Sequence, residues 1–336
     1  MKVLIVCSYR NFRKDGIIPY VKEQVNAISA LGAECDYYLV HGKGAVGYLK
    51  EIPALRKKIR EYRPDIIHAH YGLSGLLANL STRRIPVVVT YHGSDINVAK
   101  VRKFSRLAIA MAKWNIFVSQ RTMDIVHGAE RKNCSLIPCG VDLTEDQLTT
   151  QDAARVALVE SGKWKVEGGK KVLFAGMYAD EVKGPDLAME AIARVNDKMS
   201  REQSSLNDGC DHALNDVELI EMKGYSREEV NRLMCACDCL LMTSKTEGSP
   251  QVIKEAMACG CPIVSTDVGD VKERVAGLDG CYVVKNREPK EVAEAIEKAF
   301  EHKGKTKGRE KILADGLSNE QIAERIVKIY EQVKSL

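Results

Sequence analysis

Two glutamates mark the ends of the stretch Glu247-Gly-Ser-Pro-Gln-Val-Ile-Lys-Glu255. An apolar run before Glu247 predicts a buried strand, and 251–259 is predicted to be a helix with Ser249 as N-cap and Pro250 in the first helical position. Ligands of open α/β sheets bind at the carboxyl ends of strands, and helix N-termini attract phosphate. Carboxylates there can accept hydrogen bonds from sugar hydroxyls. The spacing therefore predicts a nucleotide-sugar site, with Glu247 in the loop and Glu255 in the helix.

The elements around this stretch alternate between strand and helix, and the alternation begins twice, at Val3 and again at Lys171. The pattern predicts an α/β fold of two Rossmann-like domains that face each other across a cleft. Neither first strand is followed by Gly-x-Gly-x-x-Gly, which argues against the usual NAD enzymes. We expect an N-terminal, acceptor-binding domain over 1–165 and a nucleotide-sugar-binding domain over 166–320. The helix at 321–336 is expected to pack back on the N-terminal domain, and the polar residues 197–214 are expected to form a surface loop.

The charge of the chain is unevenly distributed. Residues 1–150 contain 22 Lys and Arg against 13 Asp and Glu, whereas the rest contains 28 against 33. Part of the basic excess lies in 100–113, which has the pattern of an amphipathic helix. This segment is either a solvated helix face or a contact with anionic membrane or a pyrophosphate-bearing acceptor. Nucleic acid is a poorer match, because no basic patch interleaved with aromatic residues accompanies it.

The 11 cysteines are odd in number and spread along a long chain. Several alternate with single residues, whereas zinc sites prefer two residues between paired ligands. They are therefore interpreted as reduced, buried thiols, which favours a cytoplasmic protein. No run of about 18 apolar residues predicts a membrane span, and the N-terminus is interpreted as a strand rather than a signal peptide. His68 and His70 point the same way along a strand, but further metal ligands are not evident.

Several segments together resemble the retaining glycosyltransferases of family 4, which have the GT-B fold. The most specific is Glu247-Gly-Ser-Pro, followed by Lys254-Glu255-Ala-Met-Ala. The family's other segments are matched in order along nearly the whole chain; they are Thr90-Tyr-His92-Gly93, Ile137-Pro-Cys139-Gly-Val-Asp142, Phe174-Ala-Gly176 with Lys183-Gly184, and Thr266-Asp-Val-Gly269.

The resemblance implies roles for the matching residues. Glu247 would contact hydroxyls of the donor sugar, and Glu255 would hold the nucleotide ribose. Lys183 would neutralise the departing diphosphate, and His92 would lie against the donor sugar. The remaining donor-binding residues would act through a backbone that faces the sugar and phosphates; they are Gly16, Gly248, Ser249, Pro250 and Gln251. The fold implies no metal or other cofactor, because cationic side chains and a helix dipole stabilise the leaving group.

The chain departs from the family pattern at two positions that bear on chemistry. Met177 stands where the family has a phosphate-binding arginine, and Cys139 stands where asparagine is usual. Arg10, Arg13 and Lys14 are cations that could replace the missing charge at Met177.

The resemblance predicts a retaining glycosyltransferase of bacterial polysaccharide or glycolipid assembly, active in the cytoplasm or at the inner membrane face. It would move a sugar from a nucleotide-sugar donor to a hydroxyl of an acceptor glycan or lipid-linked sugar. No second carboxylate is placed as a covalent nucleophile, so same-face attack is expected. Two alternatives remain open: a nucleotide-sugar 2-epimerase of the same architecture, and a degenerate, non-catalytic protein that binds sugar nucleotides.

Overall fold

The computed structural model describes residues 1–10, 15–126, 133–143, 149–164, 169–205 and 216–335. The chain forms two compact units. Unit 1 comprises Met1–Val141 together with Gly316–Leu336, and unit 2 comprises Asp142–Asp315. The first unit is therefore built from both ends of the chain.

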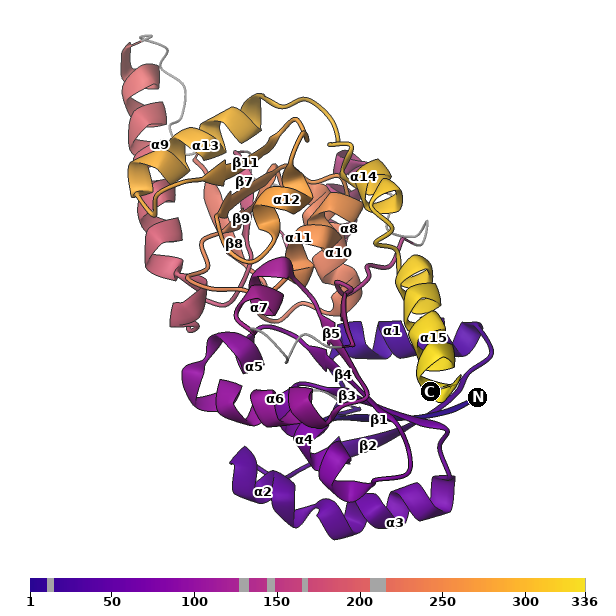
Figure 1. Ribbon diagram of the computed structural model, residues 1–336. Helices are drawn as coiled ribbons and strands as arrows, with labels where there is room; N and C mark the ends of the chain where they lie inside the picture. The colour runs from indigo at the N-terminus through magenta and orange to yellow at the C-terminus, as the bar shows by residue number, and fades with distance from the viewer. Residues whose placement is uncertain (11–14, 127–132, 144–148, 165–168, 206–215, 336) are drawn as a thin grey trace. The chain divides into compact units, whose positions relative to one another are not determined.

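Unit 1 contains a parallel sheet of six strands in the order β2-β1-β3-β4-β5-β6 (Figure 1). Parallel neighbours need a crossover, and helices supply these crossovers on both faces of the sheet. The strands are β1 (Lys2–Ser8), β2 (Glu34–Val40), β3 (Ile66–His70), β4 (Val87–Tyr91), β5 (Trp114–Phe117) and β6 (Cys134–Leu136). The helices are α1 (Pro19–Ala30), α2 (Gly44–Lys50), α3 (Ile52–Tyr62), α4 (Gly72–Ser81), α5 (Ser94–Asn97), α6 (Ala99–Met111), α7 (Gln120–Asp124) and α15 (Asn319–Ser335).

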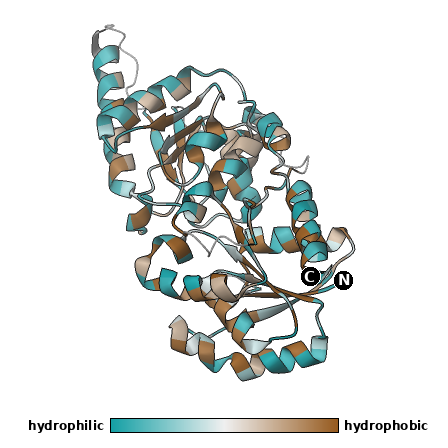
Figure 2. Cartoon of the chain, in the orientation of Figure 1, coloured by the Kyte–Doolittle hydropathy of each residue, from teal (hydrophilic) through white to brown (hydrophobic). Residues whose placement is uncertain are grey.

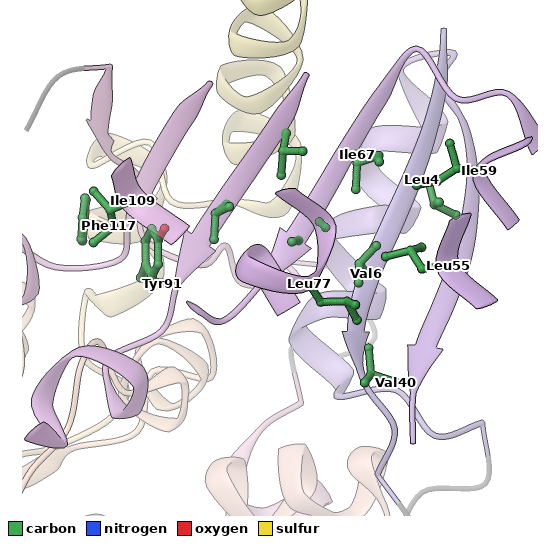
Figure 3. Packing of buried hydrophobic residues seen from close by; sticks show 14 of the residues in the cluster. Leu4, Val6, Val40, Leu55, Ile59, Ile67, Leu77, Tyr91, Ile109 and Phe117 are labelled. Atoms are coloured by element: carbon green, nitrogen blue, oxygen red, sulfur yellow. The ribbon is translucent and has the colours of Figure 1, made fainter. Parts of the chain in front are cut away.

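The sheet of unit 1 is buried on both faces, because successive side chains of a strand point in opposite directions. Leu4 and Val6 of β1 pack with Leu55 of α3 and Leu77 of α4 in one cluster (Figure 3). On the other face, His68 of β3 contacts Tyr330 of α15, and α15 lies against α1. The apolar stripe of α15 is fully or almost fully buried at Ile322, Ala323, Ile326, Ile329, Tyr330 and Val333.

Unit 2 contains a parallel sheet of five strands in the order β11-β10-β9-β7-β8. In both units the strands are mostly hydrophobic, whereas many helices have a hydrophilic side (Figure 2). The strands are β7 (Lys171–Phe174), β8 (Glu218–Glu221), β9 (Cys239–Met242), β10 (Ile263–Thr266) and β11 (Cys281–Val284). The helices are α8 (Gln151–Glu160), the short 3₁₀ helix η3 (Glu181–Lys183), α9 (Pro185–Ser205), α10 (Arg227–Ala236), α11 (Gln251–Ala258), α12 (Val271–Val275), α13 (Pro289–Glu301) and α14 (Gly308–Ala314).

Both sheets have the same strand order when each is counted from its own first strand, namely 2-1-3-4-5 with a sixth strand in unit 1. In such a sheet successive strands are added first toward one edge and then toward the other, and this change of direction falls between the first and third strands. Ligands of doubly wound folds bind at this switch point, outside the carboxyl ends of the strands. The topology therefore places one candidate site after β1 and β3 and another after β7 and β9.

One predicted loop is wrong in part, because α9 continues to Ser205. The expected loop began at residue 197, but Met199 still packs against the core that Ile192 and Val195 form. Its polar neighbours are the solvated side of the helix rather than a break in it. The rest of the expected loop, 206–214, lies outside the described residues.

Candidate functional site

The switch point of unit 2 brings Lys183 and Glu247 into contact. Lys183 ends η3, after β7, and Glu247 lies in the loop after β9. The Lys183 Nζ donates a hydrogen bond of 2.7 Å to Oε1 of Glu247, and the two side chains are 28% and 18% exposed. An ammonium and a carboxylate thus lie together where a doubly wound sheet binds ligands.

The backbone that positions Lys183 is tied to the end of β9. The Thr243 hydroxyl lies 3.0 Å from the carbonyl oxygen of Lys183 and donates a 2.8 Å bond to that of Gly184. Gly184 has φ +67°, and a Cβ there would lie 2.4 Å from the carbonyl oxygen of Thr243. A side chain at 184 would therefore push this loop off β9. The sequence identified Lys183 and Gly184 but gave no signal that Thr243 anchors them.

The lysine stem also lies directly over Gly176, where a Cβ would approach Cγ of Lys183 to 2.7 Å. Met177 follows it, and its side chain is half exposed. Arg287 reaches the same strand end and donates hydrogen bonds of 2.8 and 2.7 Å to the carbonyl oxygens of Thr243 and Ser244. This arginine is a cation near the Lys183 loop that sequence patterns could not single out, because it lies in the connection after β11.

Glu255 is bound by an arginine. The NH1 of Arg227, the first residue of α10, lies 2.6 Å from Oε1 of Glu255 in α11, and the carboxylate is 8% exposed. The start of α10 is fixed by a capping box in which Ser226 and Glu229 exchange hydrogen bonds. Burial of a carboxylate is costly unless a cation and hydrogen bonds compensate. Arg227 supplies that compensation, and no motif in the sequence marked it.

The sequence predicted Ser249 as the N-cap of α11, and this prediction is wrong. Pro250 occupies that position, without a side-chain cap. The Ser249 hydroxyl instead donates to Oδ2 of Asp270 at 2.9 Å, and Arg274 donates to the same oxygen at 2.9 Å. The serine hydroxyl therefore makes a tertiary contact instead of a helix cap.

The loop 247–250 packs against the connection that follows β10. Gly269 has φ +59°, and a Cβ there would lie 2.6 Å from the carbonyl oxygen of Gly248. Lys254 is fully buried, and its Nζ lies 3.4 Å from Oγ of Ser249. The backbone from Gly248 to Gln251, which was predicted to face the donor, is therefore packed against a second loop and fixed in position.

In unit 1, His92 directly follows β4 and lies among other imidazole and phenol groups. Its Nε2 is 3.0 Å from Nδ1 of His70, and its Nδ1 is 3.6 Å from Sγ of Cys139. The rings of Tyr71 and Tyr20 lie 4.6 and 5.2 Å from the His92 ring. The hydroxyls of Tyr20 and Tyr71 share a hydrogen bond.

The backbone around His92 is fixed by Asp95. The N–H groups of His92 and Gly93 donate to Oδ1 of Asp95 at 3.1 and 3.0 Å, and that of Gly72 donates to Oδ2 at 2.9 Å. Burial raises the pKa of Asp95 to about 6, although these bonds act in the opposite direction. Asp95 thus connects the loops after β3 and β4.

Behind His92 lies a row of two buried histidines. The His68 and His70 rings stack at 4.6 Å, as expected for alternate residues of one strand. His68 is 2.5 Å from the Tyr330 hydroxyl and 2.8 Å from that of Thr90. Burial lowers the pKa of His70 to about 3 and that of His68 well below its usual value, so both rings are neutral. Within the described part of the chain, no three His, Cys, Asp or Glu residues are grouped to hold a metal.

Gly16 belongs to unit 1, whereas the other predicted donor-binding residues belong to unit 2. Its carbonyl oxygen accepts a 2.8 Å bond from the N–H of Arg10. It has φ +74°, and a Cβ there would overlap the Tyr9 ring at 2.2 Å. Glycine is therefore required for packing at this position, and its expected contact with phosphate stays a prediction. Arg13 and Lys14 lie outside the described residues.

A cavity of about 580 Å³ opens at the switch point of unit 1. Residues after β1, β2, β3 and β4 line it, including Arg10, His41, Lys43, Tyr48 and Tyr71. The Arg10 guanidinium lies 6.0 Å from the centre of the Tyr71 ring. Cations and phenol groups together can bind a polar, anionic molecule.

Two family models match this chain. The model described as Glycosyltransferase Family 4 matches residues 23–145, and the one described as Glycosyl transferases group 1 matches residues 169–302. Together they match about three quarters of the chain. The chain therefore belongs to the group 1 glycosyltransferases, of the family 4 type.

Curated relatives agree with this assignment. TuaC of Bacillus subtilis, whose name assigns it to teichuronic acid biosynthesis, is 27% identical over 73% of this chain and 63% of its own length. An uncharacterized glycosyltransferase of Methanocaldococcus jannaschii is 27% identical over 86% of this chain and 81% of its own. A D-inositol 3-phosphate glycosyltransferase of Xylanimonas cellulosilytica is 28% identical over 62% and 57%. The alignments thus span less than two thirds of the first and third of these relatives.

Solved structures show that the fold is GT-B. Sucrose-phosphate synthase from Thermosynechococcus elongatus superposes with a TM-score of 0.77 at 18% identity, over the full length of both chains. The Anabaena protein HepE in complex with UDP superposes with a TM-score of 0.71, also at 18% identity and full coverage. Among the described residues, no helix combines the length and the apolar character that a membrane crossing requires.

Proposed function

We propose that this protein moves a glycosyl group from a nucleotide-sugar donor to an acceptor hydroxyl, with retention of the anomeric configuration. The observation that supports this best is the contact between Lys183 and Glu247 at the switch point of unit 2. A sugar and a diphosphate need those two chemistries side by side, a carboxylate for hydroxyls and a cation for phosphate. Membership of the glycosyltransferase family supports the same conclusion.

The donor would be held by three side chains of unit 2. Glu247 accepts hydrogen bonds from hydroxyls of the transferred sugar, and Lys183 donates to the diphosphate. Glu255, whose one oxygen is bound by Arg227, accepts a hydrogen bond from the ribose through the other. As negative charge grows on the leaving oxygen, Lys183 transfers part of its hydrogen bonding from Glu247 to phosphate, which stabilises the transition state more than the bound donor.

In the chemical step, the bond between the anomeric carbon and the phosphate oxygen breaks, and a bond from the acceptor oxygen forms on the same face. The acceptor proton passes to the leaving diphosphate. The intervening oxocarbenium ion is stabilised by nearby dipoles and by Glu247. Lys183 is the cation proposed to compensate for the arginine that Met177 replaces, and Arg287 fixes the carbonyl end of β9 beside it.

The acceptor would bind in the cavity of unit 1 that Arg10, Lys43 and Tyr71 line. Its cations favour an acceptor with an anionic group, such as a lipid-linked sugar with a pyrophosphate or a soluble polyol phosphate. One relative is named for inositol 3-phosphate, an acceptor of that kind.

A peripheral contact with anionic membrane is part of the proposal, and α6 supports it. Leu107 and Met111 are exposed on this helix, in a sequence that also contains Lys100, Lys103 and Arg106. Exposed apolar side chains among cations are typical of helices that lie at a membrane surface. Co-sedimentation with phosphatidylglycerol vesicles but not with phosphatidylcholine vesicles would favour the lipid-linked acceptor over the soluble one.

The test is a transfer assay with purified variants. A thermal-shift screen of UDP, GDP, ADP and their sugars first identifies the nucleotide, because a ligand of the native state raises the melting temperature. Lys183→Ala and Glu247→Ala are each expected to reduce transfer by about 10²-fold or more, the usual loss for one electrostatic site group. Nuclear magnetic resonance of the product gives its anomeric configuration.

Lys171→Ala is the matched control, because Lys171 pairs with Glu218 at the opposite end of β7. It should leave the rate unchanged. Near-normal turnover in both site variants, or an inverted product, would contradict the proposal.

Assays on the same purified protein distinguish the alternative functions. A 2-epimerase would convert the donor without any acceptor, which incubation with donor alone would reveal. Met177 favours the non-catalytic alternative, since a family cation is missing there. A nucleotide that raises the melting temperature, without transfer to any acceptor and without conversion of the donor, would support that alternative against the proposed transfer.

A further inference from the structure

A pair of cysteines lies at the end of unit 2 opposite the donor loops. Cys235 is in the last turn of α10, and Cys259 is the C-cap of α11. Each thiol shifts the pKa of the other through a side-chain hydrogen bond, and Sγ of Cys259 also lies 3.8 Å from the carbonyl oxygen of Asn231. Both residues belong to the buried core, with 5% and 2% exposure.

Lys305 is placed directly beside this pair. Its Nζ lies 3.8 Å from Sγ of Cys235 and donates a 2.5 Å hydrogen bond to the carbonyl oxygen of Thr149. The stem of the lysine lies over Gly260, where a Cβ would approach Cβ of Lys305 to 2.8 Å. The N–H of Thr306 donates to the carbonyl oxygen of Gly260 at 2.9 Å. Lys305 is an exposed residue, but its backbone and stem are packed on Gly260, and its ammonium lies beside one sulfur atom.

These contacts distinguish Cys235 from its neighbours. The hydrogen bond from Cys259 and the charge of Lys305 lower the pKa of Cys235 to about 6, although burial acts against them. Burial raises the pKa of Cys237 and of Cys261 well above the usual value. Cys235 is therefore the most acidic of these thiols, and its thiolate form is favoured over those of Cys237 and Cys261.

Both sulfur-bearing residues line a cavity of about 630 Å³, which admits small solutes. It lies at the amino ends of β7, β9 and β10, since Lys170, Asp238 and Pro262 also line it. The donor loops follow the carboxyl ends of β7 and β9, so the cavity is separate from the candidate active site. His302, Lys303 and Lys305 supply most of its basic groups.

We propose that Cys235 and Cys259 form a peroxide-reactive thiol pair, with Cys235 as the nucleophile, Cys259 as the resolving thiol and Lys305 as the cation that stabilises the thiolate. The ammonium beside the Cys235 sulfur is the observation that favours a reactive pair over inert core cysteines. The proposal does not depend on the proposed glycosyl transfer.

The steps balance with hydrogen peroxide as the oxidant. The Cys235 thiolate attacks one peroxide oxygen, the O–O bond breaks, and a sulfenic acid and a hydroxide ion form; the hydroxide takes a proton from solvent. The sulfur of Cys259 then attacks the sulfur of Cys235. The S–O bond breaks, the departing hydroxyl leaves as water with the proton of Cys259, and a disulfide joins α10 to α11. One peroxide is reduced to two waters, and a thiol reductant reverses the change.

The test uses the full chain, reduced and then freed of reductant. Limiting iodoacetamide at pH 7, followed by peptide mass spectrometry, should label Cys235 at least about tenfold faster than Cys237 and Cys261, because the thiolate is the reactive form. One equivalent of hydrogen peroxide should give the Cys235–Cys259 disulfide, and dithiothreitol should remove it.

Three variants sharpen the result. Lys305→Met, which keeps the stem and removes the charge, should slow the labelling of Cys235 at pH 7. Cys259→Ser should stop oxidation at a sulfenic acid on Cys235 that dimedone traps, whereas Cys261→Ser, the matched control, should leave the disulfide unchanged. Labelling of Cys235 no faster than of Cys261 in the unsubstituted chain, or peroxide-induced disulfides that omit this pair, would overturn the proposal.

Discussion

At the scale of single residues, the two carboxylates that are proposed to bind the donor are each bound by a cation of the same unit. Lys183 contacts Glu247, and Arg227 contacts Glu255. The two pairs differ in burial, because Glu255 is 8% exposed and Glu247 is 18% exposed. The more exposed pair is the one proposed to exchange its cation with a ligand, and we expect the more buried pair to have the larger structural role.

This difference predicts the effect of Arg227→Met. The change leaves a buried carboxylate without its guanidinium, and we expect the free energy of unfolding to fall by about 1–3 kcal/mol. Replacing both partners, as in Arg227→Met with Glu255→Met, should recover much of that loss, because two apolar groups need no pairing. Urea denaturation measures both values.

The control for these two variants is Arg194→Met, which breaks an exposed pair with Glu190. Exposed pairs one helical turn apart contribute about 0.5 kcal/mol or less. Equal losses in Arg227→Met and Arg194→Met would show that the Glu255 pair has no special structural role.

At the scale of elements, the sequence predicted well what depends on local pattern. The alternation of strand and helix, the strand before Glu247 and the helices expected at 100–113, 251–259 and 321–336 follow from hydrophobic runs and turn residues. The sequence-based prediction was wrong or silent where a tertiary contact determines what a residue does. Ser249 has the ideal type for an N-cap but bonds Asp270, and the partners Thr243 and Arg227 have no local signature. Such contacts join segments far apart in the chain, so no local pattern encodes them.

Strand β3 makes the stability of unit 1 depend on pH. Its two histidines are neutral in the folded chain, with the pKa of His70 at about 3. Unfolded histidine has a pKa of about 6.5. Between these values the unfolded chain binds more protons, so the free energy of unfolding falls as pH is lowered below about 6.5. Asp95, with its pKa raised to about 6, acts in the opposite sense between about pH 4 and 6.

We therefore expect His70→Gln to flatten the acid side of the stability curve. The slope that one such histidine contributes is about 1.4 kcal/mol per pH unit. Calorimetric melting temperatures from pH 7 to 4.5 should converge for the variant and the unsubstituted chain as pH falls. His41→Gln, at an exposed position, should leave the slope unchanged. Parallel curves for His70→Gln and the unsubstituted chain would contradict this account.

At the scale of the whole molecule, the two units have separate cores, and α15 belongs to the first. Ile326 of α15 is fully buried, as is Ile296 of α13 in unit 2. Truncation of such a side chain costs about 2–5 kcal/mol. The cost should be confined to the unit that contains the residue.

Ile326→Ala is accordingly expected to reduce hydrogen-exchange protection in β1 but not in β9. Ile296→Ala should do the reverse, and it is the matched control of equal size and burial. Loss of protection in both strands from either change would mean that the two units unfold as one cooperative body.

Unit 1 is made of two chain segments that are synthesised at different times. A chain emerges from the ribosome from its N-terminus, and domains generally fold as units. Residues Met1–Val141 emerge first, but the helix that covers one face of their sheet is made only after all of unit 2. During translation, therefore, the strand face with His68 stays uncovered while unit 2 folds. A chaperone that binds nascent apolar surface should associate with this chain until α15 has been synthesised.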